Sequence, residues 1–255
     1  MDRVKIFGIN IENTTLDDVM ILLEEKLDSY GLFTIATPNT EIAMRAKDQP
    51  KFADLVNGFD LVVPDGIGLI YASKIRKLPL KERVTGFDIS MELLSIGMDK
   101  PFNLYLLGGK PGISEKAANN VEKDFPSVTV VGNRNGYFTL EDEEEIVSSI
   151  NQTNPDVIFI GLGFPKQEEF IERNKGLLKG KIIIGNGGVI DILAGESKRA
   201  PDIFINLNLE WLYRLIKEPS RIARQMALPR FIINVITNKN SVLEGDIENE
   251  RHIGN

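Results

Sequence analysis

The sequence predicts an α/β fold: a mostly parallel sheet with helices on both faces, followed by a helical C-terminal appendage. Three observations predict it. Apolar, β-branched runs of strand length alternate with helical patterns up to about residue 195. Two of these runs stop at a proline, present small polar side chains and lead into a helical pattern. Beyond Gly195 the alternation ends and only helical patterns follow.

The strands and helices can be placed in order along the chain. Seven runs are predicted to be strands: Val4–Ile9, Phe33–Thr37, Asp60–Val63, Asn103–Leu107, Val128–Val131, Val157–Ile160 and Ile182–Ile184. The first helix is expected to begin at Thr14 or Thr15, whose hydroxyl can cap it, and to end near Gly31. Because strands and helices alternate, the sheet should be parallel and covered on both faces.

The C-terminal part has a different character. Helical segments are expected at Asp202–Lys217, Pro219–Ala227 and Pro229–Thr237. The chain therefore divides into a core at 1–195, a basic amphipathic appendage at 196–240 and a polar tail at 241–255. We expect the tail to fray.

Composition excludes several classes of chemistry. The 255 residues include no cysteine and one histidine, His252, in the polar tail. Thiolate nucleophiles, cysteine-ligated zinc and Ser-His-Asp catalysis are therefore not expected. The polar N-terminus is not typical of a signal peptide, and no apolar run is long enough to span a bilayer.

The charge is unevenly distributed. The net charge of -7 argues against a nucleic-acid partner. Residues 196–240 nevertheless carry eight lysine and arginine residues against four acidic ones. This segment therefore favours an anionic partner. The acidic run Glu141–Glu145 has a simpler explanation, because Thr139 and Asp142 mark a helix start whose dipole favours acidic residues.

Polar side chains follow two of the predicted strands. Thr37 and Asn39 end one run, and Asp65 follows another. Ligands of parallel α/β sheets bind beyond the carboxyl ends of the strands, so Asp65 could take a proton from a substrate hydroxyl. The structural alternative is a helix cap or a turn, which also uses these residue types. Asp88 and Asp191 are competing carboxylates, of which Asp88 is better explained as a helix cap.

Three further strand ends run into glycine turns. They contain Gly108 and Gly109, Gly161-Leu162-Gly163, and Gly187 and Gly188. Glycine lets backbone amides approach a phosphate closely. No dinucleotide fingerprint is present, since Lys166 stands where its third glycine would be. A tight turn without a ligand explains any one of the three, but together they favour a nucleotide-sized ligand.

Seven motifs carry a resemblance to a known family. They are Thr37-Pro38-Asn39, Pro64-Asp65-Gly66-x-Gly68, Glu82-Arg83-Val84-x-Gly86, Leu107-Gly108-Gly109, Gly161-x-Gly163-x-Pro165-x-Gln167-Glu168, Gly187-Gly188 and Glu210-Trp211-x-x-Arg214-Leu215-x-x-Glu218-Pro219-x-Arg221. In this order they resemble the WecG/TagA/CpsF glycosyltransferases, from Val4 to Ile236. Asn186 departs from the pattern, since a small apolar residue is expected there, which affects the expected nucleotide contacts.

The resemblance implies a fold and a reaction. It implies a Rossmann-like core and an appendage that docks on the cytoplasmic face of the cell membrane. The implied reaction moves N-acetylmannosamine from UDP to the 4-hydroxyl of N-acetylglucosamine on undecaprenyl diphosphate, with inversion, in wall teichoic acid synthesis. No cofactor is expected. A metal is not expected either, because no Asp-x-Asp pair follows a strand.

The resemblance also implies roles for individual residues. Asp65 would be the base, and Thr37 and Asn39 would orient the sugar or the acceptor. Arg83 would bind the acceptor or the diphosphate, although by itself it belongs to a solvated charge cluster. Further expected contacts are Gln167 with the diphosphate, Tyr137 stacked on uracil, and Asp191 near the nucleoside. An exposed helix residue and a packed surface tyrosine are the alternatives for Gln167 and Tyr137.

The appendage combines apolar and basic residues. Its apolar side chains are Ile203, Phe204, Leu207, Leu209, Trp211, Leu212, Leu215 and Ile216. With flanking cations they favour an anionic membrane surface. Packing on the core, or a subunit interface of a homo-oligomer, is the alternative. Arg214, Arg221 and Arg224 could grip a lipid diphosphate through their guanidinium groups.

Three other functions are alternatives to this reaction. A nicotinamide dehydrogenase needs a glycine fingerprint that this chain lacks. A catalytically silent membrane-associated sugar-nucleotide sensor would keep the glycine turns without needing Asp65. Transfer of a different N-acetylhexosamine is a third alternative.

Overall fold

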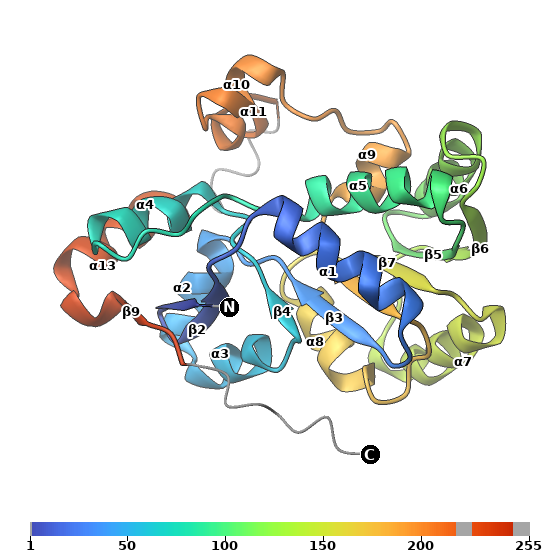
Figure 1. Ribbon diagram of the computed structural model, residues 1–255, viewed down its shortest axis with the longest axis horizontal. Helices are drawn as coiled ribbons and strands as arrows, with labels where there is room; N and C mark the ends of the chain where they lie inside the picture. Colours follow the sequence, from blue (N-terminus) through green and yellow to red (C-terminus); the bar gives the residue numbers. More distant parts are fainter. Residues whose placement is uncertain (1, 218–225, 247–255) are drawn as a thin grey trace.

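The sheet at the centre of the molecule has six parallel strands (Figure 1). The computed structural model describes residues 2–217 and 226–246. The strands lie in the order β4-β3-β8-β7-β5-β6. Their bounds are Phe33–Ala36 (β3), Leu61–Val62 (β4), Asn103–Gly108 (β5), Thr129–Arg134 (β6), Val157–Gly161 (β7) and Ile182–Gly185 (β8). The predicted α/β class and six of the seven predicted strands are confirmed.

Helices cover both faces of this sheet because successive strand residues point to opposite faces. Ile35 and Phe159 pack in one buried cluster, whereas Ala36 and Ile160 pack in the other. The first face is covered by α1 (Leu16–Asp28), α5 (Gly86–Asp99), α6 (Ile113–Asp124) and α9 (Val189–Leu193). The second is covered by α2 (Thr40–Asp48), α3 (Pro50–Asn57), α7 (Glu143–Thr153) and α8 (Lys166–Asn174).

The predicted helix starts are present. Thr15 is the N-cap of α1 and forms a capping box with Asp18. Thr139 and Asp142 form the same motif before a short 3₁₀ turn, Leu140–Asp142, that precedes α7. The acidic first turn of α7 therefore has the structural explanation expected from the helix dipole.

The prediction of a first strand at Val4–Ile9 is only partly correct, because residues 4–6 are a strand but the chain turns at Phe7 and Gly8. This segment turns back on itself as β1 (Arg3–Ile6) and β2 (Ile9–Glu12), which pair antiparallel outside the main sheet. Phe7 and Gly8 make the turn with φ of +46° and +89°. A positive φ at phenylalanine is unusual, which is why the sequence does not signal this turn.

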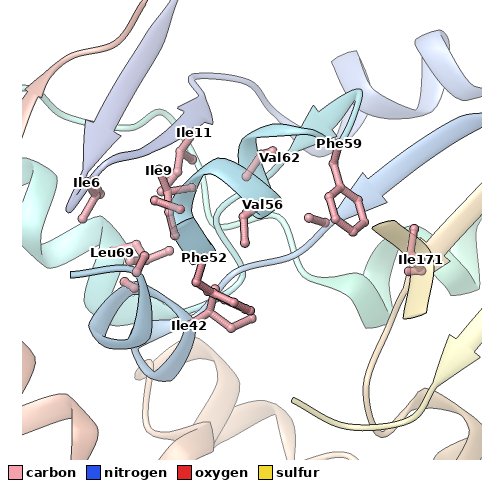
Figure 2. Packing of buried hydrophobic residues seen from close by; sticks show 14 of the residues in the cluster. Ile6, Ile9, Ile11, Ile42, Phe52, Val56, Phe59, Val62, Leu69 and Ile171 are labelled. Carbon is pink, nitrogen blue, oxygen red and sulfur yellow. The ribbon is translucent and has the colours of Figure 1, made fainter. Parts of the chain in front are cut away.

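The polar tail also contains structure that was not predicted. Residues 242–244 were expected to fray, but they form β9 (Val242–Glu244), which pairs antiparallel with β1. Val242 is buried. Figure 2 shows the isoleucines of the β1–β2 hairpin lying with Val56 of α3 and Leu69 of α4 (Ile67–Ile75) in one apolar cluster.

The predicted helix Asp202–Lys217 is two helices. They are α10 (Asp202–Asn206) and α11 (Glu210–Lys217), separated at Asn208, which has a φ of +59°. Figure 1 shows both set apart from the sheet. Most of the predicted segment Pro219–Ala227 lies outside the described residues.

The last helix, α13 (Ala227–Thr237), packs against α2 and α4. Phe231 and Val235 of this helix are completely buried. Within the predicted appendage, this part therefore contributes to the same apolar cluster as the hairpin. No helix in the described ranges has both the length and the apolar character required to cross a membrane.

Candidate active site

The turns after β3 and β4 are joined by backbone hydrogen bonds. The amides of Asp65 and Gly66 donate to the carbonyl of Pro38 at 3.1 and 3.3 Å. The Thr37 hydroxyl donates to the carbonyl of Gly185, at the end of β8, at 3.0 Å. Three strand ends are thus connected at the carboxyl edge of the sheet, where parallel α/β proteins bind ligands.

Asp65 lies on the turn after β4, the outermost strand at one end of the sheet. Its side chain is 30% exposed, so it is held by the fold yet reachable from solvent. The N-cap of α4 is Gly66, with no side-chain cap hydrogen bond, so Asp65 is not the N-cap of this helix. The structure thereby removes the helix-cap alternative for Asp65.

Arg83 lies between two carboxylates. Its Nη2 is 3.4 Å from Asp65 Oδ1 and 3.0 Å from Glu210 Oε2, and its Nε donates to the backbone carbonyl of Asp65. Burial disfavours the charged guanidinium, but the charges of Asp65 and Glu210 outweigh burial, and the pKa of Arg83 is raised. Arg83 therefore belongs to a partly buried ion network rather than to a solvated charge cluster.

The side chains of Thr37 and Asn39 both form hydrogen bonds with the backbone. Asn39 is the N-cap of α2, and its Oδ1 accepts the amides of Glu41 and Ile42 at 2.9 and 3.1 Å. The Thr37 hydroxyl proton is donated to Gly185. The Nδ2 group of Asn39 and the hydroxyl lone pairs of Thr37 are the groups with which these half-buried residues could contact a ligand.

The three glycine turns lie against one another. A Cβ atom at Gly108 would be 2.3 Å from the carbonyl oxygen of Gly161, and one at Gly161 would be 2.6 Å from that of Gly187. Gly108, Gly109 and Gly187 also have positive φ. Only glycine permits this backbone-to-backbone approach. Gly188, the N-cap of α9, has no atom within 4 Å of its Cβ position.

Gln167 is buried and holds the turn after β8. Its Oε1 accepts the amide of Gly187 at 2.9 Å, and its Nε2 donates to Glu168 Oε1 at 3.2 Å. A side chain at Gly185 would collide with it. The sequence predicted either a diphosphate contact or an exposed helix residue. The exposed alternative is wrong, and the side chain positions the backbone of the glycine turn.

Glu168 is a buried carboxylate at the start of α8. Its Oε2 has no hydrogen-bond partner among the described residues. Burial raises the pKa of Glu168 to about 7, and the neighbouring charges of Glu169 and Glu41 act in the same direction. The sequence motif contained Glu168, but only the structure shows that it is buried.

Tyr137 lies on a loop that Lys166 holds in place. The ammonium group of Lys166 donates to the carbonyls of Gly136 and Phe138 at 3.0 and 2.7 Å. The amide of Gly136 donates to Gly109, so the loop contacts the first glycine turn. The Tyr137 side chain is 68% exposed. This exposure argues against the packed surface tyrosine that is the alternative for this position.

The competing carboxylates lie on α5 and α9, two of the helices that cover the first face of the sheet. Asp88 bonds to the hydroxyl of Thr85, the N-cap of α5, and forms a 2.6 Å ion pair with Arg199. The interpretation of Asp88 as the helix cap itself is therefore wrong, because the N-cap is Thr85 and Asp88 lies in the first turn of α5 and bonds to it. Asp191 lies on α9, directly after Gly187 and Gly188.

Asn186 is buried between the sheet and α5. Its Nδ2 donates to the hydroxyl of Ser90 at 3.1 Å, whereas its Oδ1 has no partner among the described residues. This side chain therefore ties the third glycine turn to α5.

Three predicted arginines are not placed. Arg214 belongs to α11, but its side chain is not described, and Arg221 and Arg224 lie outside the described residues. Within the described ranges, no group of three or more acidic or histidine side chains is arranged to hold a metal ion.

The arrangement can carry out one kind of chemistry. It offers a reachable carboxylate, a cation beside it, and adjoining glycine turns, of which the third has no atom near the Cβ positions of Gly187 and Gly188. These are the elements that a base-assisted transfer with an anionic leaving group requires. Sequence comparison decides which class of transfer this is. The model of the WecG/TagA/CpsF glycosyl transferase family matches residues 4–243.

The chain belongs to this glycosyltransferase family. Two relatives are named N-acetylglucosaminyldiphosphoundecaprenol N-acetyl-beta-D-mannosaminyltransferase. The Staphylococcus aureus (strain MRSA252) protein is 34% identical over 247 residues, 94% of this chain and 94% of the relative. The Bacillus subtilis (strain 168) protein is 32% identical over 237 residues, 92% of each. The resemblance drawn from the motifs is thereby confirmed.

Proposed function

We propose that this glycosyltransferase transfers N-acetylmannosamine from UDP-N-acetylmannosamine to the 4-hydroxyl of N-acetylglucosamine on undecaprenyl diphosphate. The names of the relatives support both the sugar and the acceptor. The product would be a linkage-unit intermediate of wall teichoic acid. The observation that carries the proposal is the reachable Asp65 carboxylate at the edge shared with the glycine turns.

In the proposed mechanism Asp65 removes the proton from the acceptor hydroxyl. The acceptor oxygen then forms a bond to the anomeric carbon while the bond from that carbon to the diphosphate oxygen breaks. The electron pair of the broken bond leaves with UDP. Attack from the face opposite to the leaving group inverts the anomeric centre.

The leaving diphosphate needs stabilisation. A backbone amide of the glycine turns such as that of Gly188 can supply it. The amides of Gly109 and Gly187 instead hold the turns together, because they are donated to Gly161 and to Gln167. We infer a metal-independent reaction, because the sequence has no Asp-x-Asp pair after a strand. Tyr137, on the loop that contacts the first glycine turn, and Asp191, on the helix after the third, would bind the nucleoside.

The appendage would bring the enzyme to its lipid acceptor. Ile203, Leu207 and Ile216 expose more than 60% of their surface, as an apolar face that enters a membrane interface would. Arg214, Arg221 and Arg224 would contact the lipid diphosphate. The enzyme would then act on the inner face of the cell membrane, and a homo-oligomer remains the alternative use of the apolar face.

The proposal is tested by donor choice. The protein is incubated with lipid-linked N-acetylglucosamine and either UDP-N-acetylmannosamine or UDP-N-acetylglucosamine, and UDP release and product mass are measured. We expect rapid turnover with the mannosamine donor alone. Preference for the other donor would mean transfer of a different N-acetylhexosamine. Binding of UDP-sugar without turnover would indicate a sensor.

A further inference from the structure

Gln167 and Glu168 form a buried chain of hydrogen bonds that ends on the third glycine turn. Both residues lie in the first turn of α8, and both are buried. The amide of Gly187 donates to Gln167 Oε1 at 2.9 Å, and Gln167 Nε2 donates to Glu168 Oε1 at 3.2 Å. The Glu168 carboxyl group is thus two hydrogen bonds away from the backbone of the turn.

This chain has a fixed direction. A backbone amide only donates, so the Gly187 amide requires the carbonyl oxygen of Gln167, and the Gln167 amino group is then directed to an acceptor. Glu168 Oε1 is that acceptor, whether the carboxyl group is ionised or carries its proton on Oε2. Without an acceptor at residue 168, the Gln167 amide would lose the bond that fixes its orientation toward Gly187.

The charge of Glu168 changes near neutral pH. Its Oε2 has no hydrogen-bond partner among the described residues. The bonds from Gln167 and from its own backbone amide favour the charged form, but burial outweighs them and raises the pKa to about 7. The charged groups that act on it, Glu169 of the same helix and Glu41 of α2, also raise the pKa.

We propose that Glu168 is a positioning residue for the donor: it orients Gln167 and the third glycine turn, and its uncharged form admits the donor diphosphate whereas its charged form opposes it. The inference rests on the proposed function, which assigns the diphosphate to the glycine turns. Like charges repel strongly where water screens them poorly. Donor affinity should therefore fall as Glu168 ionises with rising pH.

The test is calorimetry of UDP-N-acetylmannosamine binding to the full-length protein at several pH values, without acceptor. The diphosphate of a UDP-sugar is esterified at both ends, so its charge stays constant near neutral pH, unlike that of UDP. If the donor binds only when Glu168 is uncharged, the wild-type Kd should be about tenfold higher at about pH 8 than at about pH 6.

Two substitutions separate the charge from the hydrogen bond. Glu168→Gln keeps an acceptor for Gln167 and cannot ionise, so its Kd should match that of the wild type at about pH 6 and stay there at about pH 8. Glu168→Leu also removes the acceptor and should raise the Kd about tenfold at every pH. Glu169→Gln, at the more exposed neighbouring residue, is the matched control and should keep the rise of Kd with pH.

A rise of the wild-type Kd with pH that disappears in Glu168→Gln supports the proposal. A wild-type Kd that is equal at both pH values would overturn it, and so would a pH dependence that persists in Glu168→Gln. Wild-type affinity in Glu168→Leu would overturn the orienting role. If UDP-N-acetylglucosamine bound instead, with the same effect of Glu168→Gln, the proposed donor would fail while the role of Glu168 stood, so the two failures are distinguishable.

Discussion

At the residue scale, the polar side chains around the candidate site hold its backbone in place. Gln167 uses its carbonyl oxygen on Gly187 and its amide on Glu168. Asn39 uses its oxygen as a helix cap. A substitution at either position would therefore shift the turn that carries the proposed site, so a loss of activity alone would not prove substrate contact.

Glu168 provides a prediction about stability. Burial raises the pKa of its carboxyl group to about 7 in the folded protein, against 4.5 for an ordinary exposed glutamate. Folding is therefore favoured while Glu168 is protonated, and this stability is lost as the pH rises from about 4.5 through 7. We expect Glu168→Gln to exceed the wild type by up to about 3 kcal/mol in the free energy of unfolding above neutral pH.

The measurement is urea unfolding of both proteins from about pH 5 to about pH 8. The difference should grow with pH. Glu169→Gln, at the neighbouring residue that is more exposed and pairs with Arg173, is the control and should show no such trend. A difference that is constant over this range would contradict the assignment of a buried, neutral Glu168.

At the scale of elements, the sequence pattern correctly predicted the strands whose position is determined by hydrophobic burial. Strands β7 and β8 are continuous runs of buried apolar residues, and their predicted ends agree with the structure to within one residue. The hairpin at residues 3–12 was missed because Phe7 is not a turn-forming residue. Strand β9 was missed because three residues carry too little pattern to indicate pairing with β1.

The sequence predicted which residue types form the candidate site, but not which residues their side chains contact. Parallel strands bring their carboxyl ends together, so Thr37, Asp65 and the glycine turns could be expected at one edge. The Glu210–Arg83 pair joins residues 127 positions apart and has no local sequence signal. The burial of Glu168 and the hydrogen bonds from Lys166 to the loop that carries Tyr137 likewise depend on tertiary packing.

The loop that carries Tyr137 gives a prediction about donor binding. Lys166→Met removes the ammonium group that bonds to Gly136 and Phe138, and so loosens the loop. We expect the KM for the UDP-sugar to rise about tenfold, in line with the loss of charged hydrogen bonds, with a smaller change in kcat. Lys179→Met, at an exposed position, is the control. An unchanged KM in Lys166→Met would show that this loop does not contribute to donor binding.

At the scale of the whole molecule, the C-terminal residues are not one separable unit. Helices α10 and α11 stand away from the sheet, whereas α13 closes the apolar cluster beside α2 and α4 (Figure 1). Removal of everything after Gly195 would expose this cluster. A truncation there would therefore impair folding as well as any membrane docking. Point substitutions in α10 and α11 can test membrane docking without exposing the cluster.

The role of α13 is tested by two substitutions on its opposite faces. Phe231 is completely buried, and Phe231→Ala should lower the free energy of unfolding by about 3–5 kcal/mol. Ile233 is 61% exposed, and Ile233→Ala should change it by less than about 1 kcal/mol. Urea denaturation measures both. Equal effects would contradict the packing of α13 on the core.

The most direct test of the whole account is the turnover rate of Asp65→Asn with UDP-N-acetylmannosamine and lipid-linked N-acetylglucosamine. Asparagine keeps the size of the side chain but cannot accept the proton. We predict that kcat falls by about 10²–10⁴-fold while UDP binding by calorimetry stays as in the wild type. Turnover within about twofold of the wild type would contradict the assignment of Asp65 as the base.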